Sequence, residues 1–240
     1  MKRLILVQLL ASLIPSAYTI PISDIFIKTG FEERFAFKNS SISNDNFDIE
    51  KILYELRKSD KKNAPRLINH GNGKKTIIYK TNEFKKNIAK SELLNLIKNP
   101  KSFNDEQSFI KDSFEKLNKF GIKLNLIEDS EDIAAKWYPS EKKLTINKNV
   151  IKLGSRIFAE VLNHEMIHIA QSCKAGSLQS YPSLIGLKVS LNIEKKYLLS
   201  KDINKEIYKE ITKLEKSLED EAYTYQTDLK MGKFLIEKYC

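Results

Sequence analysis

Two histidines and a glutamate form the most informative pattern in this chain of 240 residues. His164, Glu165 and His168 stand in the run His-Glu-Met-Ile-His, which is the motif H-E-x-x-H. On a helix, residues four apart lie one above the other, so both imidazoles could bind a single metal ion. Glu165 would lie one position round the helix, where it could take a proton from water at the metal. The motif therefore predicts a zinc site with Glu165 as general base.

The motif is informative because histidine is rare here. The chain has three histidines, and two of them are in the motif. The third, His70, lies in a Gly/Asn-rich loop and is interpreted as a surface residue. The alternative interpretation of the motif is a pair of helix-surface histidines beside a glutamate.

A third metal ligand is expected downstream, because catalytic zinc usually has three protein ligands. No third histidine follows His168, so the H-E-x-x-H-x-x-G-x-x-H pattern of metzincins is absent. A carboxylate from a later helix is then the best candidate. Glu219 and Glu221 both lie in the run 218–223. The alternative for both is a solvated acidic helix turn.

In these motifs and their order the sequence resembles gluzincin metallopeptidases, whose third ligand is a glutamate on a downstream helix. Glu219 and Ala222 match the E-x-x-A surroundings of that glutamate, whereas Tyr223 stands where an acidic residue is usual. The resemblance implies a zinc-dependent peptidase and favours Glu219 as ligand. The apolar stripe of the same segment instead places Glu221 nearer the buried side. Both glutamates therefore stay open.

Some further polar residues could support the site. Gln171, three residues after His168, faces the same side of the helix and could hydrogen-bond a ligand. Tyr181, Tyr223 and Tyr225 could donate to an oxyanion. In zincins the edge strand before the metal helix pairs with extended substrate, so by resemblance the strand at 143–149 is expected to do so here.

These residues need a helix and a sheet to position them. Helical spacing and a glycine before Ser155 predict a helix from Ser155, as N-cap, to about Gln171. The resemblance implies an α+β, zincin-like fold. In it a small mixed or antiparallel sheet packs on the active-site helix, and a C-terminal helical part carries the third ligand. The other predicted elements are helices at 47–58, 83–99, 105–120 and 185–239 (with a break near 200), strands at 76–79 and 122–126, and a hairpin of 134–138 with 143–147.

The chain divides into three predicted parts. Residues 1–19 have the positive start, apolar run and small residues of a signal peptide, although an uncleaved anchor over residues 4–26 stays open. Residues 20–100 form an N-terminal, mostly helical region of unknown role. Residues 101–240 form the metallopeptidase domain. The expected location is therefore outside the cytoplasm, in the periplasm or the extracellular space.

Charge and cysteine content bound the partners. Lys and Arg number 41 against 31 Asp and Glu, for a net charge of +10. Most of this charge is lysine interleaved with acids, which indicates a solvated surface and not a nucleic-acid interface. The expected partner is a peptide or protein substrate.

Cys173 and Cys240 are either one disulfide or two free thiols. The alternative function is a non-catalytic zinc-binding envelope protein on a zincin scaffold.

Overall fold

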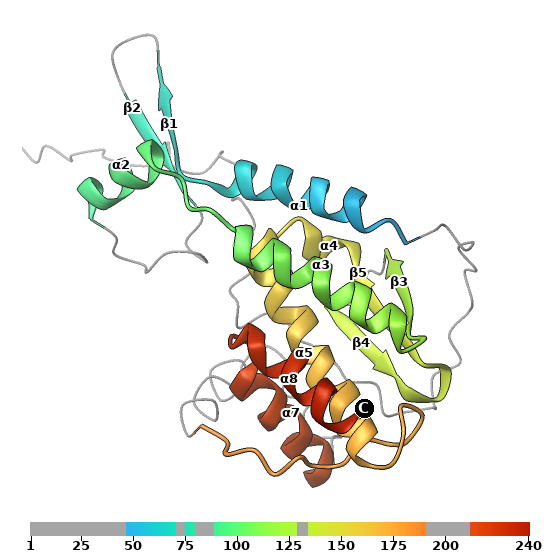
Figure 1. Ribbon diagram of the computed structural model, residues 1–240. Helices are drawn as coiled ribbons and strands as arrows, with labels where there is room; N and C mark the ends of the chain where they lie inside the picture. The colour runs from blue at the N-terminus through green and yellow to red at the C-terminus, as the bar shows by residue number, and fades with distance from the viewer. Residues whose placement is uncertain (1–46, 71–74, 80–88, 129–133, 191–211) are drawn as a thin grey trace, which may run out of the picture.

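The computed structural model describes residues 47–70, 75–79, 89–128, 134–190 and 212–240, which form a mixed α+β structure (Figure 1). The predicted signal peptide, the anchor alternative and the first part of the helix expected at 83–99 lie outside these residues. Among the described helices, none has the length and apolar character needed to cross a membrane.

Helix α5, Ser155–Lys174, carries the H-E-x-x-H motif and passes through the middle of the molecule (Figure 1). Between residues 157 and 173 every side chain except Glu160 is buried. A helix buried on all sides needs neighbours on all sides. Here they are α1 (Ile49–Asn63), α3 (Asn104–Lys119), α4 (Lys148–Ile151), strand β4, and the two C-terminal helices.

A three-stranded sheet lies against α3 and α5. Its strands are β3 (Lys123–Ile127), β4 (Ala135–Tyr138) and β5 (Lys143–Asn147), in the order β3-β5-β4. The predicted hairpin is confirmed, because β4 and β5 pair antiparallel around a short 3₁₀ turn at Pro139–Glu141. Strand β5 pairs with β3 in parallel, so β5 is the central strand and β4 is an edge.

The core joins both parts of the predicted domain division. Phe114 of α3 packs edge-on against Phe158 of α5 and against Phe47 before α1. Ile52 and Leu56 of α1 belong to the same core. The division near residue 100 stays a prediction, but α1 packs directly on the elements that follow that residue.

The C-terminal part consists of α7 (Lys213–Tyr225) and α8 (Leu229–Tyr239). The long helix expected from 185 is wrong over 185–190, which form no helix, and 191–211 lie outside the described residues. Helix α7 begins at a capping box formed by Thr212 and Glu215. Cys173 and Cys240 form a disulfide that ties the last residue to α5.

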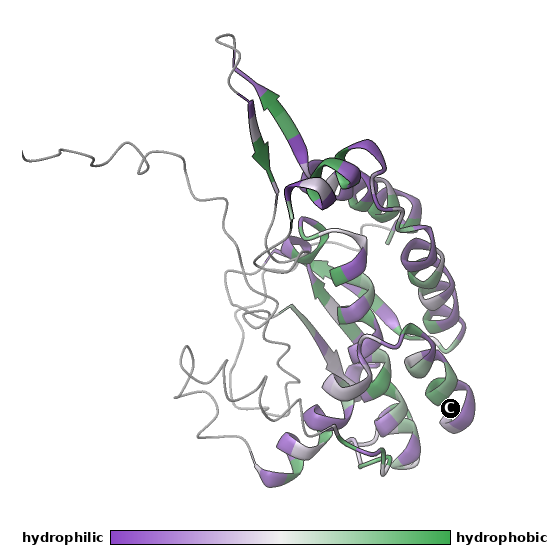
Figure 2. Cartoon of the chain, turned by 90° about the vertical axis from the view of Figure 1, so that its left-hand side faces the viewer, coloured by the Kyte–Doolittle hydropathy of each residue, from purple (hydrophilic) through white to green (hydrophobic). Residues whose placement is uncertain are grey.

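A small antiparallel pair, β1 (Arg66–Asn69) and β2 (Lys75–Ile78), extends away from the helices together with α2 (Lys90–Lys98) (Figure 2). The strand predicted at 76–79 is confirmed within one residue. The region from 20 to 100, expected to be mostly helical, thus contains strands as well in its described part.

Candidate metal site

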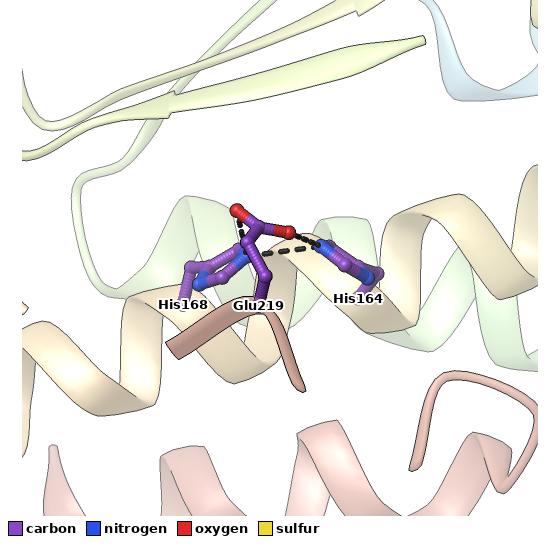
Figure 3. Close-up of side chains that lie close together, drawn as sticks. All are labelled: His164, His168 and Glu219. Atoms are coloured by element: carbon purple, nitrogen blue, oxygen red, sulfur yellow. Dashed lines mark hydrogen bonds and ion pairs between the residues drawn. The ribbon is translucent and has the colours of Figure 1, made fainter. Parts of the chain in front are cut away.

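The two motif histidines face each other on one side of α5, as their spacing predicts (Figure 3). The Nε2 atoms of His164 and His168 lie 2.9 Å apart, and both rings are completely buried. Helix α7 brings Glu219 to the same point, with Oε2 3.2 Å from His164 Nε2 and Oε1 3.6 Å from His168 Nε2. Two imidazole nitrogens and a carboxylate therefore converge, and these three residues form a group that could hold a metal ion.

Glu221 is not part of this group. Its Oε1 accepts hydrogen bonds from the backbone amides of Gly186 (2.6 Å) and Leu187 (2.8 Å). Its Oε2 accepts from the amide of Ile185 (2.9 Å) and from Gln171 Nε2 (3.0 Å). The helical stripe correctly predicted that Glu221 is buried, but its carboxylate is already surrounded by donors. The geometry therefore favours Glu219 over Glu221 as the candidate ligand.

The ring of His168 has a fixed orientation. Its Nδ1 lies 2.7 Å from Gln171 Oε1, and a carbonyl oxygen can only accept, so Nδ1 is the donor in this contact. In the neutral ring Nε2 then carries the lone pair and faces the candidate metal position. The predicted hydrogen bond between Gln171 and a motif histidine is therefore present.

The ring of His164 also packs against an aromatic side chain. The ring of Tyr223 packs edge-on against it, with centroids 4.6 Å apart. Nδ1 of His164 makes no well-formed hydrogen bond to the described residues. Tyr223, which stands where gluzincins usually have an acid, therefore contacts a metal-ligand candidate through packing.

Buried charges shift the pKa values of the cluster. Burial lowers the pKa of His164. Burial also acts to lower the pKa of His168, but the carboxylates of Glu219 and Glu165 outweigh it and raise that pKa. Burial acts to raise the pKa of Glu219, yet the two imidazoles hold it well below its usual range. An ionised carboxylate facing two ring nitrogens favours a cation between them.

Glu165 is completely buried beside the cluster. Burial raises the pKa of its carboxyl to about 8, the charge of Glu219 adds to this rise, and His168 and the Trp137 backbone amide oppose it. That amide belongs to β4, the charge of Lys136 also acts to lower the pKa, and neither Glu165 oxygen makes a well-formed hydrogen bond to the described residues. The side chain can therefore bind and release a proton near neutral pH.

Residues outside the motif set the position of α7. Asn163, directly before His164, donates from Nδ2 toward the carbonyls of Tyr225, Gln226 and Asp228 in the turn between α7 and α8. Its Oδ1 accepts from the amide of Gly232, where a Cβ would lie 2.5 Å from this oxygen. Asn163 was not predicted as a site residue, although a buried amide in the middle of an apolar helix is a signal for such a role.

The start of α5 differs from the prediction. Ser155 is the first helical residue and the N-cap position is Gly154, which makes no side-chain cap bond. Asp60 of α1 supplies the cap: its Oδ1 accepts from the Ser155 amide (2.7 Å) and its Oδ2 from Ser155 Oγ (2.6 Å). Ser155 does not act as the N-cap because it is itself the first helical residue, and its hydroxyl instead donates to Asp60 and accepts from Gln107. Gly154 has φ of +97°, and a Cβ there would lie 2.6 Å from Asp60 Oδ1.

The other predicted residues lie as follows. Tyr225 donates from its hydroxyl to the carbonyl of Lys188 and so holds a loop. Tyr181 is about half exposed, and burial raises the pKa of its hydroxyl to about 12. Neither is part of the metal-ligand group. The strand expected to pair with substrate, at 143–149, is wrong in this role because β5 already has β3 and β4 on its two sides. The edge strand against α5 is β4.

Comparison with protein-family models, with curated proteins and with solved structures finds no match to this chain. The metal-site interpretation therefore depends on the geometry of the described residues.

Proposed function

We propose that this chain is a zinc-dependent metallopeptidase that hydrolyses peptide bonds. The observation that carries the proposal is the convergence of His164 Nε2, His168 Nε2 and Glu219 beside a buried glutamate that follows the first histidine. It is the combination of three ligands and a general base that water-activating zinc sites use.

Zinc fits the donor set. Two imidazoles and one carboxylate are typical zinc ligands, and bond lengths of 2.0–2.2 Å at tetrahedral angles put ligand atoms roughly 3.3 Å apart. The corresponding separations here are 2.9, 3.2 and 3.6 Å. The hydrogen bond from His168 to Gln171 further supports zinc, because it leaves Nε2 available as a ligand.

The ion and the protein would supply different parts of the chemistry. Zinc, when bound, polarises a carbonyl group and makes water more acidic. Glu165 accepts the proton from the attacking water and then delivers it to the leaving amine. Burial raises the pKa of this carboxyl, which makes it a stronger base than an exposed glutamate. His164, His168 and Glu219 hold the ion, and the burial of all four residues strengthens the electrostatic interactions in the site.

The zincin-like fold is part of the same proposal. A mixed sheet with an antiparallel edge strand, β4, lies beside the H-E-x-x-H helix, and a later helix supplies the third ligand. This order supports the resemblance to gluzincins. By that resemblance an extended substrate would add to the side of β4 that pairs with no other described strand, close to Glu165.

An exported location is also proposed. A disulfide between Cys173 and Cys240 favours an oxidising compartment such as the periplasm or the extracellular space. The sequence pattern of a signal peptide or anchor at the N-terminus points the same way.

A non-catalytic zinc-binding protein is the second candidate. It is favoured by the burial of the ligands, whose exposed fractions are 0% for both histidines and 6% for Glu219. Against it, structural zinc usually has four protein ligands, whereas three converge among the described residues.

The test combines metal analysis with peptide cleavage. We expect one zinc per chain in the purified protein and cleavage of an unstructured protein substrate. Glu165→Gln should retain the zinc and lose at least about a hundredfold in rate, because general base catalysis contributes on the order of 10²–10⁴. Bound zinc with equal rates in both proteins would overturn the catalytic role and favour the second candidate, and a protein without zinc affinity would overturn the site itself.

A further inference from the structure

We infer that Glu221 is a positioning residue for the metal site, and that it acts on His168 through Gln171. The inference rests on the proposed function only in assuming that His168 binds a metal. It concerns a carboxylate outside the ligand group, which therefore needs a different explanation for its burial.

The first step is the amide of Gln171. An amide side chain has one accepting and one donating end, and its two neighbours decide which way round it lies. Gln171 Nε2 lies 3.0 Å from Glu221 Oε2 and 3.2 Å from the carbonyl oxygen of Leu218. Both neighbours can only accept, so the donating end must face them. The accepting end, Oε1, must then face His168.

The second step is the imidazole. Because Gln171 presents an oxygen 2.7 Å from His168 Nδ1, that nitrogen carries the hydrogen. The remaining nitrogen, Nε2, then has its lone pair directed at Glu219 and His164. Glu221, together with the carbonyl of Leu218, thus favours the ring form of His168 that can bind a metal, although it does not touch the ring itself.

The third step is the anchor of Glu221. Three successive backbone amides, those of Ile185, Gly186 and Leu187, donate to its carboxylate. Gly186 has φ of +87°, a conformation that L side chains rarely adopt and that helps consecutive amides point at one anion. Four donors in total surround the carboxylate and leave it little freedom to rotate.

The same segment is held from both helices of the site. Lys174 of α5 donates to the carbonyl of Ile185 (2.8 Å), and Tyr225 of α7 donates to that of Lys188 (3.0 Å). The amide of Ser183 donates to the backbone carbonyl of Gln171 (3.1 Å). Residues 183–188 therefore form a fixed support for Glu221, and the orientation of a metal ligand depends on this loop.

The experiment is a double-mutant cycle read by zinc affinity and by imidazole NMR. The hydrogen-bonded series Glu221–Gln171–His168 is called the relay below. Glu221→Met and Gln171→Met each remove one member of it at similar side-chain volume. We expect each to weaken zinc binding by about 10–100-fold, as is usual for groups that orient a metal ligand. The double variant should be no weaker than Gln171→Met, because Glu221 has no other route to the ring.

Glu215→Met is the matched control, because Glu215 lies on the same helix and only caps its start. It should leave zinc affinity unchanged.

NMR of the imidazole nitrogens shows which ring nitrogen of His168 carries the hydrogen, which we call the ring form. The measurement needs neither metal nor substrate. The chain has only three histidines, and His70 contacts Thr76 in the exposed hairpin and serves as a reference. In the metal-free protein at alkaline pH, the neutral His168 ring should carry its hydrogen on Nδ1, and this preference should weaken in Glu221→Met. Additive losses of zinc affinity, or an unchanged ring form in both Met variants, would overturn the inference.

The experiment distinguishes a failure of this inference from a failure of the proposed function. A wild-type protein that binds no zinc overturns that function, while the ring form still tests the relay. If Glu221→Met does not fold, Gln171→Met decides alone: an unchanged ring form and zinc affinity would contradict the relay, and a loss of both supports it.

Discussion

Glu219 and Glu221 lie two residues apart on α7, and both are almost completely buried, but their carboxylates face opposite kinds of partner. Glu221 meets four hydrogen-bond donors. Glu219 meets the Nε2 atoms of two imidazoles, one of which is required by Gln171 to present a lone pair. The carboxylate of Glu221 therefore receives its hydrogen bonds from the protein itself, whereas the carboxylate of Glu219 is placed to bind a cation.

The comparison shows what selects a metal ligand among neighbouring acids. Both glutamates have the right type, the right helix and similar burial, so none of these properties distinguishes them. The surrounding groups do: Glu221 accepts from three backbone amides and Gln171, whereas Glu219 faces the nitrogens of two imidazoles. Glu165 differs from both, since neither of its oxygens has a hydrogen-bond partner among the described residues and burial raises its pKa to about 8.

Replacement of Glu219 should have the largest effect. We expect Glu219→Gln to weaken zinc binding by more than about a hundredfold, beyond the range of groups that only orient a ligand, because it removes a ligand charge. Zinc affinity is measured by competition with a chromophoric chelator at fixed pH. The matched variant Glu221→Gln should cost less. The reverse order of the two variants would exchange the roles assigned to the two glutamates.

Replacement of Glu165 should stabilise the metal-free protein, whereas replacement of Glu219 should weaken metal binding. Its carboxyl has a pKa of about 8 in the folded protein and 4.5 as a reference, so in this pH window the folded protein holds a proton that the unfolded chain has released. The group therefore favours the folded state at low pH, and its contribution is lost as the pH rises from about 5 to 8. Glu165→Gln removes this loss and should stabilise the metal-free protein by up to about 4 kcal/mol at pH 8, and by less than about 1 kcal/mol at pH 5.

Urea denaturation with a chelator at both pH values measures this difference. Glu115→Gln, an exposed position on α3, is the control and should show no pH-dependent gain. A Glu165→Gln protein that is less stable than the wild type at pH 8 would contradict the raised pKa.

The sequence predicted the parts of the site that depend on local spacing. His164, Glu165 and His168 follow from one helical turn, and Gln171 follows from the next. The choice between Glu219 and Glu221 could not be predicted, because it depends on amides at 185–187 that reach α7 only in the folded chain.

The errors in the fold have similar causes. A helical stretch over 185–239 with a break near 200 fits the apolar spacing, but the capping box at Thr212 and Glu215 is a local signal that a helix begins there. The central place of β5 depends on parallel pairing with β3, which the spacing of residues does not reveal. The cap of α5 comes from Asp60, 95 residues earlier in the chain.

Asp60 provides the smallest effect and the third carboxylate of the comparison. Like Glu221 it is surrounded by donors, which are the amide and hydroxyl of Ser155 and the side chain of Gln107 (3.3 Å). Unlike Glu221 it has no path to a metal ligand, because His164 lies nine residues along a fully packed helix from Ser155. We therefore expect Asp60→Ala to lower the free energy of unfolding by about 1 kcal/mol, as for a lost N-cap, and to leave zinc affinity within twofold.

Asp112→Ala is the control, since Asp112 is half exposed and faces Lys233 at 3.6 Å, a contact worth little in solvent. Denaturation and zinc titration of both variants separate stability from metal binding. Weaker zinc binding in Asp60→Ala, with the fold intact, would mean that the start of α5 sets the positions of the ligands. Asp60 and Glu221 would then not differ in role, because both carboxylates would affect metal binding.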